Sequence, residues 1–419
     1  MKVLCSSLAA FPTMPDANTK SFVFFDTPNN ANVGRIAHGW PSELRKVGYA
    51  PSTEIWDFVL FSFAVCAADY SCHRDRSSDG WTREIELSVT MVAPERWNAQ
   101  ADPIQKMLRI LTGDYWKVIF LPGGPPPSNG ERQICDRDCV ALLSGGLDSL
   151  IGGIDLRSQG RHPIFVSQLA HEDSARQRKY AATLDGAQWH QQWSHKVVFD
   201  GPQEPSTRAR SMAFYGLAVL ASSLLDDQSP EIFVPENGFI SLNPPLLPGR
   251  MASLSTRTTH PLFMAMLQSL LASVGVGARL TMPYKFKTKG EMMSECLDPN
   301  LLAQYAADTT SCGRFRTYNR MHCGRCVPCM VRKAAFLSGG TVADTTHYKF
   351  PSLSNAAKGA ADDPMAAACA VLTANDKGID AFLGATLSFA DPHDKAAYRG
   401  VAERGLSEIA DLLARDGML

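Results

Sequence analysis

The most constraining feature of this chain is the glycine-rich turn at residues 144–149, which reads S-G-G-L-D-S. The apolar residues 140–143 before it are typical of a buried strand, and the pattern after it predicts a helix capped by Asp148 or Ser149. Two consecutive glycines let the backbone approach an oxyanion, and a helix N-terminus attracts negative charge. The turn therefore predicts a phosphate cradle, although an ordinary strand-to-helix connection has a similar composition. Its members are Ser144, Gly145, Gly146, Leu147, Asp148 and Ser149.

Length and composition narrow the class of protein. A chain of 419 residues is too long for one typical domain, so we expect two or three units. The 41 basic and 42 acidic residues nearly cancel, so no bulk attraction to nucleic acid or to an anionic membrane is indicated. No apolar run reaches the ~18 residues of a membrane span, and the first residues make a poor signal peptide. The eleven cysteines include closely spaced pairs, which favour metal over disulfides. We therefore expect a cytoplasmic protein with no membrane partner.

The sequence around the turn predicts a doubly wound parallel sheet over residues 135–340. Strand-like runs alternate with helix-like segments here, which is the pattern of an α/β domain whose sheet is covered on both faces. Ligands of such sheets bind beyond the carboxyl ends of the strands, so the residues that follow each run are candidates for function. The expected strands are residues 140–143, 163–167, 196–199, 231–234 and 279–282.

Two further units are expected on either side of this domain. Residues 1–134 are predicted to form an α+β accessory module, in which residues 59–68 and 85–91 read as two strands joined by a polar hairpin tip. A proline- and glycine-rich stretch at residues 122–130 is the expected linker. Residues 341–419 are predicted to be a helical extension. Its apolar stripe suits either the core or an oligomer contact, which leaves a homodimer open.

Charged and polar residues follow the expected strand ends. Glu236 and Asn237 come after the fourth strand and suit an amine or the edge of a heterocycle, although an Asn-Gly turn explains Asn237 equally well. Arg210 begins a helix and Arg257 lies in a polar loop, and both guanidinium groups suit phosphate or carboxylate. Lysines crowd the loop after the last strand, which indicates an anion site or, alternatively, a solvated basic loop. They include Lys287 and Lys289.

A group of four cysteines follows the last strand. Their spacing, C-x10-C-x2-C-x2-C, allows four thiolates to surround one tetrahedral ion with no open position, which predicts a structural Zn²⁺ within residues 312–329. An iron–sulfur cluster on the same ligands is the alternative, and Cys296 and His322 are lesser candidates for ligands. Residues 312–333 also carry six basic and no acidic side chains, which suits an anionic substrate. The four expected ligands are Cys312, Cys323, Cys326 and Cys329.

The turn together with this cysteine group resembles the PP-loop ATP pyrophosphatases, and among them the 7-cyano-7-deazaguanine synthase (QueC-like) family, over about residues 139–337. The supporting residues are the turn, the Arg210 helix, the stretch 283–291 and the motif from Cys323 to Cys329. The resemblance implies an adenine nucleotide alpha hydrolase-like fold, with ATP, Mg²⁺ and Zn²⁺ as cofactors. In size and layout the chain is most similar to the QatC-type proteins of Qat anti-phage defence operons, because it extends well beyond the shared region on both sides.

The resemblance implies an ATP-dependent carbon–nitrogen ligase. Such enzymes adenylate the carboxylate of 7-carboxy-7-deazaguanine, release pyrophosphate and let a nitrogen nucleophile displace AMP. The extensions favour an amine of an operon-encoded protein partner as the acceptor. In this interpretation the turn binds pyrophosphate, Asp148 binds Mg²⁺ or fixes the loop, and Glu236 with Asn237 holds the base. The residues expected to act in catalysis are Asp148, Ser149, Arg210 and Lys289, and those expected to bind substrate are Glu236, Asn237, Arg257 and Lys287.

Three other functions are compatible with the sequence. One is housekeeping 7-cyano-7-deazaguanine synthesis in queuosine biosynthesis, with ammonia as the acceptor. Another is a PP-loop tRNA sulfurtransferase, in which Cys135 or Cys139 carries the sulfur and the cysteine group holds an iron–sulfur cluster. The third is a non-catalytic ATP-binding scaffold of a defence complex, although the intact S-G-G-x-D-S turn argues against it.

Overall fold

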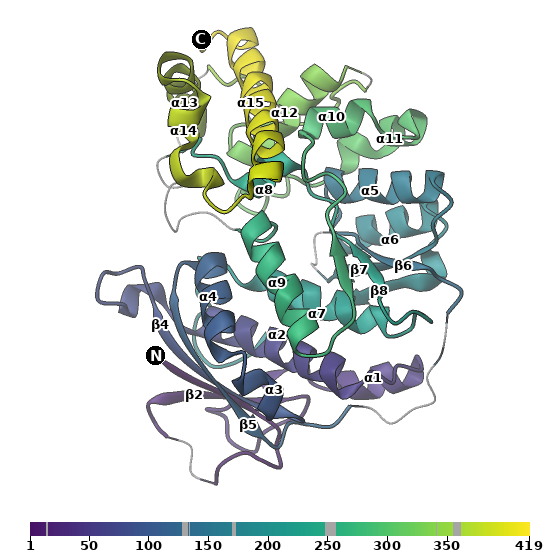
Figure 1. Cartoon of the computed structure of the whole chain (residues 1–419), viewed down its shortest axis with the longest axis vertical. Coiled ribbons are helices and arrows are strands. Elements are labelled where there is room, and N and C mark those ends of the chain that lie inside the picture. Colours follow the sequence, from purple (N-terminus) through teal and green to yellow (C-terminus); the bar gives the residue numbers. More distant parts are fainter. Residues whose placement is uncertain are drawn as a thin grey trace.

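The computed structural model describes the chain except for residues 14–15, 128–132, 134, 170–172, 248–256, 341 and 355–361. Two β-sheets of mainly parallel strands are separated by helices, and a group of helices from the last third of the chain lies beyond the second sheet (Figure 1). The chain is therefore an α/β protein, as the alternation of strand-like and helix-like segments predicts.

The first sheet comes almost entirely from the N-terminal third of the chain. Its strand order is β5-β4-β1-β2-β3-β9, and the first five strands in that order are parallel. Because these five strands are parallel, the unit is α/β, and the expected α+β module is wrong. The strands are β1 (Lys2–Ser6), β2 (Thr19–Phe24), β3 (Gly34–Ile36), β4 (Glu84–Met91) and β5 (Tyr115–Pro122). The helices are α1 (Trp40–Lys46), α2 (Thr53–Ser71), α3 (Pro94–Asn98) and α4 (Ala101–Thr112).

A long helix replaces one of the strands expected in this unit. Residues 59–68 lie in the middle of α2, in which every side chain from Trp56 to Asp69 is buried. A helix that is buried on all sides has no polar stripe, so its apolar run cannot be told from a buried strand by periodicity. The expected hairpin is therefore wrong. Residues 85–91 do form a strand, β4, in which buried side chains alternate with more accessible ones over most of its length.

The second sheet lies within residues 135–340 and is wholly parallel, as expected. Its order, β11-β10-β6-β7-β8, places the first strand of the set beside the fourth, which creates a topological switch point between β6 and β10. The strands are β6 (Cys139–Leu142), β7 (Pro163–Gln168), β8 (His190–Trp193), β10 (Glu231–Phe233) and β11 (Arg279–Thr281). The connecting helices are α5 (Leu147–Ser158), α6 (Ser174–Thr183), α7 (Arg210–Ser222) and α9 (Pro261–Ser273).

Residues 196–199 do not supply the third strand of the second sheet, contrary to expectation. That place belongs to β8, whereas β9 (Val197–Val198) pairs antiparallel with β3 of the first sheet. One buried core also joins the two sheets, from Val3 in β1 through α2 and α7 to Leu271 in α9. In this middle layer α2 packs on α7 and α4 packs on α9. The expected boundary at residue 134 and part of the expected linker lie outside the described residues.

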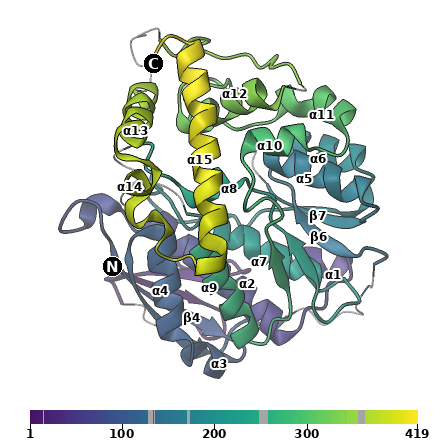
Figure 2. The same ribbon diagram turned by 45° about the horizontal axis from the view of Figure 1, so that its top comes forward.

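The part of residues 341–419 that the structure describes is largely helical, as expected. Helix α15 is the longest of this group and packs along α12 and α8, while α13 and α14 lie beside it (Figure 2). No helix among the described residues is both long and apolar enough to cross a lipid bilayer. The helices within residues 341–419 are α13 (Asp363–Lys377), α14 (Ile379–Leu383) and α15 (Pro392–Arg415). The helices near them that come earlier in the chain are α8 (Gly238–Leu242), α10 (Lys289–Ser294), α11 (Pro299–Tyr305) and α12 (Val327–Gly339).

Candidate functional site

The S-G-G-L-D-S turn lies at the switch point of the second sheet, between the end of β6 and the start of α5. Gly145 has a φ of 91°, a left-handed conformation that favours glycine. Gly146 is the N-cap residue of α5 and none of the described side chains caps the helix, so the expected caps, Asp148 and Ser149, are wrong. The hydroxyl oxygens of Ser144 and Ser149 lie 3.1 Å apart. The first N–H groups of α5 are therefore left for an anion.

Asp148 is buried and joins three segments that are distant in sequence. Its Oδ1 lies 2.8 Å from the Nζ of Lys289 at the start of α10. Its Oδ2 accepts hydrogen bonds from the backbone N–H of Asn237 (3.1 Å) and from the side-chain amide of the same residue (2.7 Å). These contacts fix the turn against the loop after β10 and against α10, which favours the loop-fixing role among those expected for Asp148.

Glu236 completes this network as a neutral acid. Burial and the neighbouring Asp148 carboxylate raise the pKa of Glu236 well above its ordinary value. Burial acts in the same direction on Asp148, but the Lys289 ammonium and the hydrogen bonds from Glu236 and Asn237 outweigh it and hold the pKa of Asp148 below its ordinary value. The protonated Glu236 donates a hydrogen bond to Asp148. The cluster therefore contains one anion and one cation, and neither is left unpaired.

A cavity of about 440 Å³ borders the turn. Ser144 and Ser149 line it from the turn, Glu236 from the loop after β10, and Arg210 from the start of α7. Its volume falls within the range of cavities that bind cofactors and other small molecules. The cavity therefore brings four of the expected site residues together at the carboxyl ends of β6 and β10.

Two other expected residues lie elsewhere. Arg257 lines a separate cavity of about 400 Å³ together with His260 and Phe389. Lys287 lines a cavity of about 180 Å³ and forms an ion pair with Glu295. Neither Arg257 nor Lys287 lines the cavity beside the turn. Their roles as substrate ligands stay predictions.

Sequence patterns did not point to several residues that surround the cavity. The side-chain oxygen of Gln168, the last residue of β7, accepts a hydrogen bond from the Nε of Arg210 (3.1 Å). Gln177 in α6 donates to the carbonyl oxygen of Ser144 (3.1 Å) and so holds the turn. Gln168 could have been identified from the sequence, because it lies at the end of a strand. Gln177 could not, because nothing in the sequence distinguishes a glutamine within a helix. The lining also includes Asp173, Tyr215, Thr258 and Thr259.

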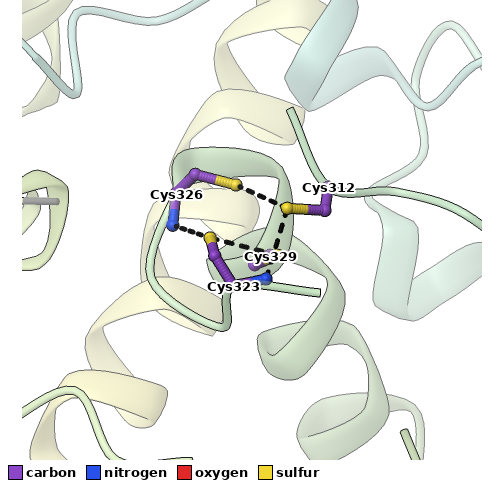
Figure 3. A group of neighbouring side chains, drawn as sticks. All are labelled: Cys312, Cys323, Cys326 and Cys329. Carbon is purple, nitrogen blue, oxygen red and sulfur yellow. Dashed lines mark hydrogen bonds between the residues drawn. The ribbon is translucent and has the colours of Figure 1, made fainter. Parts of the chain in front are cut away.

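The four cysteines form one buried group (Figure 3). All four Sγ atoms lie within 4.8 Å of one another. The Sγ atoms of Cys312 and Cys326 are 3.9 Å apart, and those of Cys323 and Cys329 are 3.8 Å apart. Four sulfurs held tetrahedrally at ~2.3 Å from Zn²⁺ would be about 3.8 Å from one another. The predicted ligands are therefore confirmed as a group that fits a metal such as zinc.

Backbone hydrogen bonds prepare this group for negative charge. The Sγ of Cys312 accepts from the N–H of Cys323 (3.3 Å), and the Sγ of Cys323 accepts from the N–H of Cys326 (3.2 Å). Such bonds favour the thiolate form, which is the form that binds metal. The lesser candidates lie apart from it. The Nε2 of His322 accepts from the N–H of Ser311 (3.2 Å), and Cys296 belongs to another core cluster.

The cysteines considered as sulfur carriers are both buried. Cys139 is fully enclosed within β6, and Cys135 is 8% exposed. Burial raises the pKa of each thiol. A buried thiol that resists ionisation is a poor nucleophile, so neither side chain is suited to carry sulfur in this conformation.

No protein-family model, curated protein or solved structure matches this chain. The residues and geometry of the site therefore carry the functional argument.

Proposed function

We propose that this protein is an ATP-dependent ligase, which adenylates the carboxylate of a 7-deazaguanine-type substrate and transfers the acyl group to a nitrogen nucleophile. The observation that carries this proposal is the uncapped S-G-G-L-D-S turn at a switch point, beside a cavity that also contains Arg210. Open N–H groups and two hydroxyls suit the pyrophosphate portion of ATP, and a guanidinium group suits the α-phosphate or a carboxylate.

The proposed chemistry begins by activating a carboxylate. One carboxylate oxygen attacks the α-phosphorus of ATP, and the bond from that phosphorus to the bridging oxygen breaks, so pyrophosphate leaves with the electron pair. The turn holds the departing pyrophosphate, and Arg210 offsets the charge that gathers on the α-phosphate. The nitrogen nucleophile then attacks the acyl carbon and loses a proton, while AMP departs with its oxygen.

The two metals have different places in this proposal. Mg²⁺ supplies charge neutralisation when it accompanies the nucleotide phosphates. No step is assigned to a protein-bound Mg²⁺, since the structure shows Asp148 paired with Lys289 and hydrogen-bonded to Asn237. Zn²⁺ suits the four cysteines, and a site with four thiolates has no position left for substrate. Its proposed role is therefore to hold the segment around α12.

The proposed acceptor is an amine of a partner protein, in anti-phage defence of the Qat type. A second α/β unit that shares a core with the catalytic sheet supports this choice over free ammonia, because a small nucleophile needs no additional domain. Housekeeping nitrile synthesis is the second candidate, since it uses the same activation step. The burial of Cys135 and Cys139 makes the sulfurtransferase a weaker candidate.

The test is incubation of the full chain with Mg-ATP and 7-carboxy-7-deazaguanine, with or without ammonia and with or without an operon-encoded neighbour. Mass spectrometry scores AMP, pyrophosphate and the acylated product. We expect substrate-dependent AMP release and a mass increase on the neighbour. A nitrile formed with ammonia alone would favour the housekeeping synthase. ATP binding with no AMP under any condition would contradict ligase activity and favour the scaffold.

A further inference from the structure

A second cavity of about 480 Å³ adjoins the one beside the turn. The two cavities share Gln168, Thr207 and Arg210 as lining residues. Tyr70, near the end of α2, lines the second cavity from the first unit, and Arg316 lines it from the cysteine-containing segment. We call this cavity the junction chamber. It is built from three parts of the chain that are far apart in sequence.

A chain of hydrogen bonds connects Tyr70 to Arg210. The Nε of Arg210 donates to the side-chain oxygen of Gln168 (3.1 Å), so the amide nitrogen of Gln168 faces the Nδ1 of His195 (3.0 Å). Burial and the Arg210 charge lower the pKa of His195 to about 4, so the ring is neutral at pH 7 and carries one N–H. Since Nδ1 accepts from Gln168, the proton lies on Nε2, which is 3.0 Å from the Tyr70 hydroxyl.

This arrangement leaves the Tyr70 hydroxyl with a proton to donate. Its oxygen accepts from His195, and no other hydrogen bond of this hydroxyl occurs among the described residues. Burial raises the pKa of Tyr70 above its ordinary value, so the hydroxyl stays protonated. Arg210 uses its Nε for Gln168, and its two Nη nitrogens have no partner in the described part of the chain. Both groups line the junction chamber as donors.

The first unit also fixes the backbone next to Arg210. The Oδ2 of Asp69 in α2 accepts from the backbone N–H groups of Arg208 (2.7 Å) and Ala209 (2.8 Å), directly before α7. The N–H of Glu204 donates to the carbonyl oxygen of Tyr70 (2.8 Å). The end of α2 therefore positions both walls of the chamber, even though it lies more than a hundred residues earlier in the sequence.

The charges around the chamber favour an anion. The one acidic side chain in its described lining, Glu204, already accepts from the backbone N–H groups of Arg74 (2.9 Å) and Ser206 (2.7 Å). Two arginines line the same chamber. We infer that the junction chamber binds the carboxylate substrate, and that the Tyr70 hydroxyl and the Arg210 guanidinium hold its carboxylate group at the wall shared with the nucleotide cavity. This inference rests on the proposed function, and it makes the first unit part of the substrate site.

The test compares the full chain with its Tyr70→Phe variant. Isothermal titration measures the binding of 7-carboxy-7-deazaguanine in the presence of a non-hydrolysable ATP analogue, and of the analogue alone. We expect Tyr70→Phe to weaken binding of the carboxylate by about tenfold or more, as for a lost hydrogen bond to a charged group, and to leave binding of the analogue unchanged. Tyr180→Phe is the matched control, because it removes a buried hydroxyl that lines neither cavity.

The outcomes separate this inference from the proposed function. Equal binding by the unaltered chain and by Tyr70→Phe would overturn the inference, as would no binding of the carboxylate to the unaltered chain. AMP release that is insensitive to Tyr70→Phe would leave the ligase proposal standing without the chamber. Binding that is sensitive to Tyr70→Phe but unaccompanied by AMP release would support the chamber and contradict the ligase.

Discussion

The two sheets have the same internal strand order, but their switch points differ. Numbered along the chain within each sheet, the five parallel strands of both lie in the order 5-4-1-2-3. In the second sheet, the switch point between β6 and β10 borders a cavity of about 440 Å³ and an uncapped helix. In the first sheet, the corresponding point lies between β1 and β4, and the chain itself fills it.

Three contacts close the switch point of the first sheet. The N–H of Ser7, directly after β1, donates to the hydroxyl oxygen of Thr90 (3.0 Å). The Ser7 hydroxyl donates to the carbonyl oxygen of Gly123 (2.6 Å), and the N–H of Gly124 donates to the carbonyl oxygen of Met91 (2.8 Å). The segment that follows β5 therefore lies where a ligand would bind in an open sheet of this order.

A carboxylate of the protein also satisfies the N–H groups after β4. Asp57 in α2 accepts from the N–H groups of Val92 (2.8 Å) and Ala93 (2.9 Å). In the second sheet, the side chains at the switch point leave the first N–H groups of α5 without a cap. The comparison teaches that strand order alone does not make a site. Backbone donors must also be left without a side-chain cap, and among the described residues this occurs at the start of α5.

The largest effect is expected at the cysteine group, which belongs only to the half with the open switch point. Cys326→Ser should abolish stoichiometric zinc binding and lower the melting temperature. The reason is that the apparent free energy of zinc binding, about 10–16 kcal/mol in small structural sites, contributes to folding. Metal analysis and thermal melting measure both. Cys369→Ser alters an exposed cysteine and should retain the metal. Iron in the metal analysis, or a brown protein, would indicate that the cysteines bind an iron–sulfur cluster instead of zinc. A wild-type protein without metal would contradict both the zinc site and the iron–sulfur site.

The next largest effect is expected at a buried charge cluster of the first unit, whose Arg74 also donates from Nε to the carbonyl oxygen of Ser206 before α7 (3.3 Å). Asp114 lies 2.8 Å from Arg74 and 2.6 Å from Arg83, and all three side chains are at most 4% exposed. Asp114→Ala should lower the free energy of unfolding by about 3–5 kcal/mol, because it leaves buried guanidinium charge without its partner. Urea denaturation measures the change.

An exposed ion pair between β4 and β5 provides a control for this buried cluster. Lys117 in β5 pairs with Glu86 in β4 at 2.9 Å, but Lys117 is 65% exposed. Lys117→Ala should lower the free energy of unfolding by no more than about 1 kcal/mol. If the two variants lost similar amounts of unfolding free energy, burial would not govern how much the Asp114 cluster contributes to stability. The first unit would then not act as a rigid support.

The sequence predicted the features that depend on neighbouring residues. The turn at 144–149, most strands of the second sheet and the four cysteines were recognisable because a short run contains the whole signal. Helix α2 was missed because a helix buried on every side has no periodic polar face. Residues 196–199 were assigned to the wrong sheet because pairing partners such as Arg35 are set by tertiary structure.

The site shows the same limit. Lys289 reads as an anion ligand at a strand end, yet it pairs with Asp148, which lies 141 residues earlier. Glu236 reads as a charged group, yet burial and the carboxylate beside it raise its pKa well above the ordinary value. Neither outcome follows from local patterns, because both depend on which charges burial brings together. Polar residues after strand ends could be identified, but their protonation and partners could not.

The protonated Glu236 predicts how stability depends on pH. The pKa of Glu236 is raised in the folded state, so between its ordinary value of 4.5 and the folded value the unfolded chain loses a proton that the folded chain keeps. The contribution of Glu236 to the free energy of unfolding is therefore fully present at low pH. It falls as the pH rises, by up to about 1.4 kcal/mol per pH unit. Glu236→Gln keeps a donor for Asp148 but cannot ionise. Its stability relative to wild type should rise from pH 5 to pH 8 in urea denaturation, and parallel curves would contradict a protonated Glu236.

The smallest effect, and the most direct test of the comparison, comes from two matched glycines. Gly145 at the open switch point and Gly123 at the filled one have φ values of 91° and 96°. Alanine at either position should destabilise the folded protein by about 1–2 kcal/mol, because its backbone would be strained at a positive φ. An added Cβ at Gly123 would also lie 2.7 Å from the Cβ of Ala10. Gly145→Ala should weaken ATP binding at least tenfold, whereas Gly123→Ala should lower stability and leave ATP affinity unchanged. Titration of both variants with an ATP analogue decides the matter: if Gly123→Ala impairs binding as strongly as Gly145→Ala, the two switch points are not functionally distinct.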